Sequence, residues 1–110
     1  IKMSESSLYH NRIFSKVETV CCKCASRTTG NKVDVTEMYI GKTKTSLVVS
    51  VARSLALMIM HDTYGITYRK IARRANMSEK AVMKSVAKAR IYRFSDPVYN
   101  RAYELIMTEL

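Results

Sequence analysis

The stretch from Gly65 to Ala89 constrains the fold of this chain more than any other. Two short amphipathic helical patterns meet there at a break, residues 75–77, and Ser78 stands where it can cap the second helix. The apolar and small residues recur at helical spacing in both patterns: Tyr68, Ile71 and Ala72, then Val82, Ser85, Val86 and Ala89. One face of each helix is therefore largely apolar, and the stretch predicts a helix-turn-helix over about residues 67–91.

The opposite faces of these two helices are strongly basic. Glu79 is the only acid in the stretch, against seven basic residues: Arg69, Lys70, Arg73, Arg74, Lys80, Lys84 and Lys88. The whole chain has 19 Lys and Arg against 9 Asp and Glu, a formal net charge of +10. Such a charge attracts polyanions, of which nucleic acid is the commonest, so the helix pair predicts binding to duplex DNA.

The rest of the chain predicts a small all-α domain. Its 110 residues suit one modest core, and three glycines and one proline favour helices over hairpins. We expect a compact bundle of about five to six helices, with the helix-turn-helix packed on a long central helix. Residues 1–7 are expected to form a loose segment and residues 8–110 a single domain. The expected elements are a first helix over about 8–26, a helical turn from Asp34 to Tyr39, the central helix over 43–64, the helix pair, and a last helix after Asp96 and Pro97.

From about Ile13 to Leu110 the chain resembles the C-terminal DNA-binding domain of the bacterial replication initiator DnaA, and more distantly the Trp repressor family. Its central helix has V-A-R-S-L-A-L-M where the family has P-R-Q-x-A-M, and G-I-T-Y-R-K-I stands where the family has S-L-x-x-I-G. Arg53, Ala56 and Ile71 match the family's arginine, alanine and isoleucine without gaps. The resemblance implies a fold and a way of docking on DNA.

The segment that would read the DNA bases, at the start of the second helix, departs from the family pattern. Residues 76–82 read Asn-Met-Ser-Glu-Lys-Ala-Val where the family has Gly-Arg-Asp-His-Thr-Thr-Val, so its aspartate, histidine and threonine readers are absent. Lys42 and Lys44 stand near the position of a family arginine that enters the minor groove. The nucleotide-binding domain and any phosphate-binding Gly-rich loop are missing, so neither a nucleotide cofactor nor the initiator's target is expected.

The docking residues fall into two groups. The first two turns of the second helix would reach base edges in the major groove, which predicts base-reading by Ser78, Glu79, Lys80, Met83 and Lys84. Phosphate contacts are predicted for Lys42, Lys44, Arg53, Thr67, Arg69, Lys70, Arg73 and Lys88. For Arg53 two alternatives stay open, because it could contact phosphate or pair with an acid inside the domain.

Other chemistry has little support in the sequence. Cys21, Cys22 and Cys24 lack a second set of ligands at metal-binding spacing. Cys21 and Cys24 fit buried positions on a helix face, and an odd number of thiols fits a reducing compartment. We find no recognisable nucleophile motif, carboxylate pair or metal cluster, so we expect no enzyme activity and no cofactor. Without an apolar run of membrane-spanning length or a signal peptide, we expect a cytoplasmic protein of a prokaryotic cell, or of a phage or plasmid, without membrane contact.

The sequence therefore predicts a sequence-specific double-stranded DNA-binding protein that acts in replication or transcription control. The alternative is a protein-interaction module that binds an acidic partner of a replication or transcription complex. The oligomeric state stays open, since the initiator domain can dock as a monomer on an asymmetric site, whereas repressor relatives dimerise.

Overall fold

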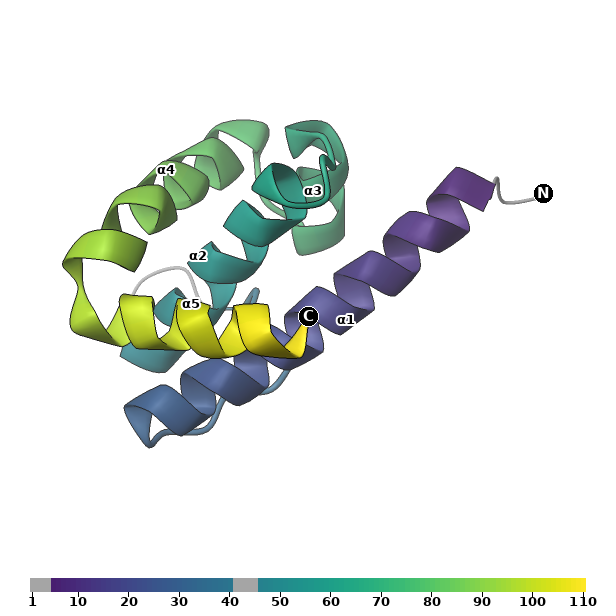
Figure 1. Cartoon of the computed structure of the whole chain (residues 1–110). Coiled ribbons are helices and arrows are strands. Elements are labelled where there is room, and N and C mark those ends of the chain that lie inside the picture. Colours follow the sequence, from purple (N-terminus) through teal and green to yellow (C-terminus); the bar gives the residue numbers. More distant parts are fainter. Residues whose placement is uncertain (1–4, 41–45) are drawn as a thin grey trace.

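The computed structural model describes residues 5–40 and 46–110, with side chains from Tyr9 onward. These segments form five helices and no strand, which confirms an all-α bundle of about five helices (Figure 1). The helices are α1 (Glu5–Thr29), α2 (Leu47–Asp62), α3 (Tyr68–Ala75), α4 (Glu79–Ser95) and α5 (Pro97–Glu109). Lys42 and Lys44, two predicted phosphate contacts, lie outside the described residues.

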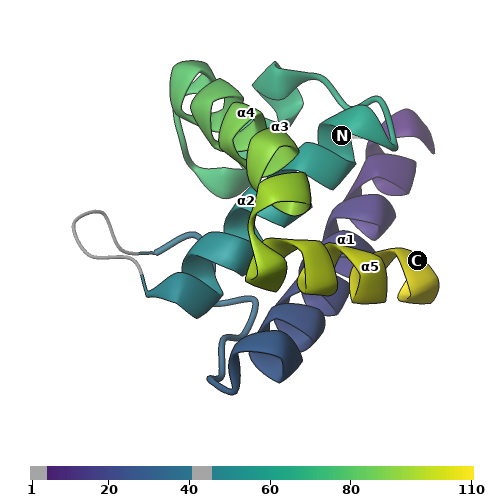
Figure 2. The same ribbon diagram turned by 60° about the vertical axis from the view of Figure 1, so that its left-hand side comes forward.

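Helix α2 is the centre of the fold. Every side chain from Ser54 to Met60 is buried, so this part of the helix is covered on all sides. All four other helices pack against it. Figures 1 and 2 both show α2 running through the middle of the molecule, with α1 on one side and α4 on the other.

Helix α1 is longer than expected at both ends. It begins at Glu5, so residues 5–7 belong to the helix and not to a loose segment, and it ends at Thr29. Gly30 then takes the left-handed conformation at φ 76°, and its N–H donates to the Ser26 carbonyl. The first turns of α1 project beyond the other helices, and Tyr9 is 61% exposed there (Figure 1).

Polar side chains cap four of the helices, and three of these starts, those of α3, α4 and α5, were predicted from the sequence. Ser46 caps α2, Thr67 caps α3, and Ser78 caps α4, each by accepting a hydrogen bond from a backbone N–H three residues later. Asp96 caps α5 by accepting from the N–H groups of Val98 and Tyr99, with proline at the first helical position. The start of α2 differs from the expected Thr43, which lies outside the described residues.

Two further boundaries differ from expectation. Helix α4 continues to Ser95, about one turn past the expected end of the helix pair near residue 91, because it ends only where Asp96 takes an extended conformation to cap α5. Residues 35–39 form turns where a short helix was expected. Asp34 still acts there as a cap, since its side chain and its carbonyl both accept from the Glu37 N–H.

The three cysteines are free thiols buried on the inner side of α1. Burial raises the pKa of Cys21, and it raises the pKa of Cys22 to about 12. Burial, with a hydrogen bond to Glu109, raises the pKa of Cys24 to about 11. In the described segments, no cluster of three or more His, Cys, Asp or Glu side chains is arranged to hold a metal ion.

The thiols of the folded protein are therefore expected to react slowly with iodoacetamide, since the thiolate is the nucleophile. Because the pKa values are raised, the thiolate fraction is small at neutral pH, and the rate at Cys24 should rise about tenfold per pH unit up to about pH 11. Mass spectrometry of protein alkylated in native buffer and in urea measures this. Rapid labelling of all three thiols in native buffer at neutral pH would contradict the burial described here.

Candidate nucleic-acid interface

Helices α3 and α4 are joined by a tight turn of three residues, 76–78. Asn76 takes the left-handed conformation at φ 55°, and the Met77 N–H donates to the Ala72 carbonyl at 3.0 Å. Asparagine tolerates this conformation better than most residues, so the chain can turn sharply between the helices. The turn brings the capped N-terminus of α4 to the surface.

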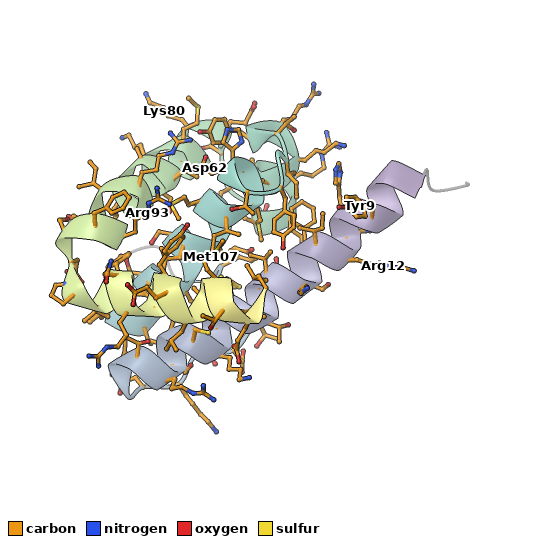
Figure 3. All side chains as sticks on the ribbon, viewed as in Figure 1. Tyr9, Arg12, Asp62, Lys80, Arg93 and Met107 are labelled. Carbon is orange, nitrogen blue, oxygen red and sulfur yellow. The ribbon has the colours of Figure 1, made fainter. Side chains whose placement is uncertain are left out.

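The two helices bury one face and expose the other. On the buried side, Ile71, Ala72 and Ala75 of α3 pack into the same core as Val82, Val86 and Ala89 of α4. The exposed cations of the pair that make no ion pair with a described residue are Arg69, Lys70, Arg73, Lys80, Lys84 and Lys88, and we call them the six-cation face. Lys80 lies at the N-terminal end of α4 and is labelled in Figure 3.

No carboxylate among the described residues forms an ion pair with the six-cation face. The ion pairs found within residues 9–40 and 46–110 join Lys23 to Glu109, Arg74 to Glu18 and Arg90 to Asp62. None of them includes a member of the face. The face therefore combines six positive charges with one exposed acid of the same helices, Glu79. Such a surface attracts a polyanion.

Two of the six cations contact side chains of neighbouring helices that carry no negative charge. Lys70 Nζ lies 3.1 Å from His10 Nδ1 on α1, and Lys88 Nζ donates to Ser50 Oγ on α2 at 2.8 Å. Lys88 Nζ also lies 5.8 Å from the centre of the Tyr92 ring. These contacts hold both ammonium groups near the surface without neutralising their charge.

The five predicted base-reading residues all lie at the exposed start of α4. Glu79, Lys80, Met83 and Lys84 occupy its first two turns, with their side chains exposed. Ser78 is the cap residue, and its Oγ accepts from the Ala81 N–H at 3.1 Å. Its hydroxyl therefore has a structural role, although it keeps a proton to donate. Glu79 in the first turn also suits the positive end of the helix dipole.

The predicted phosphate-contacting residues are more dispersed. Arg69, Lys70, Arg73 and Lys88 belong to the six-cation face, and Thr67 caps α3 by accepting from the Lys70 N–H. Arg53 lies on α2, where Nε donates to the Met38 carbonyl at 2.6 Å and Nη2 to the Ile40 carbonyl at 3.0 Å. It has no acid partner among residues 9–40 and 46–110, and it ties the 35–40 turn to α2.

Arg74 of α3 is partly exposed, but its guanidinium is paired with a carboxylate of α1, so it is not counted in the six-cation face. Its Nε and Nη2 donate to the two carboxylate oxygens of Glu18 at 3.0 and 2.7 Å. Glu18 on α1 is 0% exposed, and it also accepts from Tyr39 Oη at 2.7 Å. Burial, followed by the nearby Glu18 carboxylate, raises the pKa of Tyr39. This network, centred on the buried Glu18 carboxylate, joins α1, the 35–40 turn and α3.

The sequence pattern gave a weak signal for this network. Arg74 stands three residues after Ile71 and next to Ala75, so it borders the buried side of α3. Glu18 stands directly after Val17 and three residues before Cys21, within the apolar side of α1. A charged residue at such a position requires a partner, but the sequence does not identify it.

None of the helices in the described segments is long and apolar enough to cross a membrane. Comparison with known proteins finds no matching family model, no matching curated protein and no matching solved structure.

Proposed function

We propose that this protein binds double-stranded DNA and that α3 and α4 act as a helix-turn-helix. The observation that carries the proposal is the six-cation face, whose charges have no carboxylate partner among the described residues. Two members of the face, Lys80 and Lys84, lie in the first two turns of α4, directly after its capped and exposed N-terminus. Duplex readers of this class place that part of the second helix in the major groove.

The side chains at the start of α4 can distinguish bases. Lys80 and Lys84 can donate to guanine O6 and N7, and Glu79 can accept from a cytosine amine. Met83, which is half exposed, can contact a thymine methyl group. The proposed reading set therefore offers donors, an acceptor and an apolar group within two helical turns.

The remaining cations of the face suit the DNA backbone. Arg69, Lys70 and Arg73 extend from α3, and Lys88 lies one turn past Lys84 on α4. Contacts of this type set affinity and orientation but carry no sequence information. We leave Arg53 out of the contact set, because two of its donors are bound by the carbonyls of Met38 and Ile40.

We propose further that the scaffold is of the replication-initiator type but that its target differs. Support comes from the matched positions Arg53, Ala56 and Ile71 and from the different residues at 76–82. The process would be replication or transcription control. Selection of duplexes from a random pool identifies the site: a palindromic consensus implies a dimer, and an asymmetric one a monomer.

The primary test is the salt dependence of binding to labelled duplex DNA, measured by fluorescence anisotropy. If the six cations, whether they contact bases or backbone, together release the counterions of about six phosphates, log K should fall against log salt with a slope of about −5. Polyglutamate of similar charge density serves as a competitor, because an acidic-protein module would prefer it to DNA. A flat salt dependence, or preferential binding to polyglutamate, would overturn the proposal.

Single substitutions should separate reading from backbone contact. Lys84→Ala is expected to cost about 1 to 3 kcal/mol on the selected site and to relax the base preference at one position. Arg73→Ala should weaken binding to all duplexes alike and make the salt slope shallower by about 1. Anisotropy titrations on the selected site and on a shuffled duplex measure both. If Lys84→Ala weakens the two duplexes equally, α4 is not the reading helix.

A further inference from the structure

The second half of α4 exposes a different surface from the first half. Ile91 is 63% and Phe94 is 73% exposed, and large apolar side chains that gather on one side of a helix can mark an interaction surface. With Met83 and Ala87 they follow the spacing i, i+4, i+8 and i+11, which places them on one side of the helix. The outward side of α4 thus begins with lysines and ends with an isoleucine and a phenylalanine.

Ile91 and Phe94 lie too far along α4 to enter a DNA groove together with the first two turns of the helix. At 1.5 Å per residue, Ile91 and Phe94 lie roughly 18 and 22 Å along the axis from Glu79. Figure 3 shows Lys80 and Arg93 at opposite ends of α4. A duplex held by the first two turns would therefore leave the apolar end accessible.

An arginine beside this surface is held in place but lacks a carboxylate. The Arg93 guanidinium carbon lies 4.4 Å from the centre of the Phe94 ring and 5.0 Å from that of Tyr103 on α5. Nη1 donates to Tyr103 Oη at 3.0 Å, whereas Nε is covered and has no hydrogen-bond partner in the described part of the chain. The two rings fix the guanidinium plane, and a covered donor without a partner is costly. A carboxylate beside the Phe94 ring could supply the charged partner that this guanidinium lacks.

We propose that Ile91, Phe94 and Arg93 form a docking surface for an acidic, apolar segment of a partner protein. Large apolar side chains of the segment would cover Ile91 and Phe94, and a neighbouring carboxylate would pair with Arg93. Charge complementarity favours this occupant over a second copy, since each copy carries a net charge of +10 and exposes Lys88 and Arg101 nearby in the sequence. The surface does not depend on the proposed DNA binding.

The test is selection of displayed random peptides of about 16 residues on the immobilised full chain, with counter-selection against the double variant Ile91→Ser, Phe94→Ser. Both side chains are exposed, so the double variant should fold normally. We expect enriched peptides with Asp or Glu next to Phe, Leu, Ile or Trp. Their affinity should fall at least about tenfold in the double variant and in Arg93→Gln.

The matched control is Leu47→Ser, which removes another apolar side chain, 53% exposed, from the start of α2. It should leave peptide binding unchanged, and the double variant should keep the duplex affinity and salt slope of the parent protein. No enrichment, enrichment of peptides without acids, or equal binding by the double variant would overturn the proposal. Sedimentation gives one more contrary outcome. If the parent protein self-associates and the double variant does not, the surface binds a second copy of the chain and the proposal is wrong.

Discussion

Replacing Arg74 with alanine is expected to lower the free energy of unfolding by about 3 to 5 kcal/mol. The substitution leaves the Glu18 carboxylate, which is 0% exposed, with only the Tyr39 hydroxyl as a partner. It also removes the guanidinium from the Phe14 ring, whose centre lies 5.5 Å away. Urea unfolding followed by far-UV circular dichroism measures the change.

Arg90→Ala is the matched control for this prediction. Arg90 holds Asp62 with the same two-bond geometry, at 2.9 and 2.6 Å, but both side chains are partly exposed. Solvent screening limits the expected loss to about 0 to 1 kcal/mol. Similar losses in the two variants would show that Glu18 is not desolvated as described.

The Glu18 pair also explains why the variant should affect the helix pair. Helices α1 and α3 have no close backbone approach in the described segments, and side chains alone connect them. Arg74 is therefore the main link between α3 and the first helix, with the weaker contact of Lys70 and His10 beside it. Loss of the link is expected to loosen α3 as well as to destabilise the fold.

The sequence predicted what local chemistry decides. Thr67, Ser78 and Asp96 start their helices because each side chain satisfies an N–H group within three residues, and this information lies entirely within the segment. The turn between α3 and α4 is equally local, since it depends on Asn76 alone taking the left-handed conformation. The central position of α2 followed from its apolar residues around more than half its circumference.

The sequence could not predict partners that are distant along the chain. Arg74 and Glu18 are 56 residues apart, and helical periodicity alone leaves Arg74 at the border between the two faces of α3. For Arg53 the sequence allows two partners, a phosphate or an acid. In the structure it instead donates to two backbone carbonyls, which lie 13 and 15 residues earlier in the chain. A carbonyl partner leaves no trace in the residue pattern, because every residue has one.

The candidate interface was predicted unevenly for the same reason. Exposure of Glu79, Lys80, Met83 and Lys84 follows from the helical period once Ser78 fixes the start of α4. The surface at Ile91 and Phe94 was missed, because the helix pair was expected to end near residue 91, which left Phe94 off the helix. The ligands of both surfaces, duplex DNA and an acidic peptide segment, stay predictions.

The second large effect is expected from the three cations of α3. Replacing Arg69, Lys70 and Arg73 with glutamine should weaken duplex binding roughly 500-fold at about 0.1 M salt, since each phosphate contact contributes about 0.9 of a tenfold step. The slope of log K against log salt should change from about −5 to about −3 for the same reason. Glutamine has nearly the helix propensity of lysine and arginine, so α3 should keep its fold.

The control variant replaces Arg12, Lys16 and Arg27 of α1 with glutamine, which lowers the net charge by the same three units. These side chains are exposed, and Figure 3 shows Arg12 on the side of α1 away from α3 and α4. Because charges beyond about 10 Å are screened at this salt, the control should lose less than about threefold and keep its slope. If both variants lose affinity equally, binding follows the net charge of the protein, and the six-cation face is not a defined site. If only the α3 variant fails, the contacts belong to the helix pair.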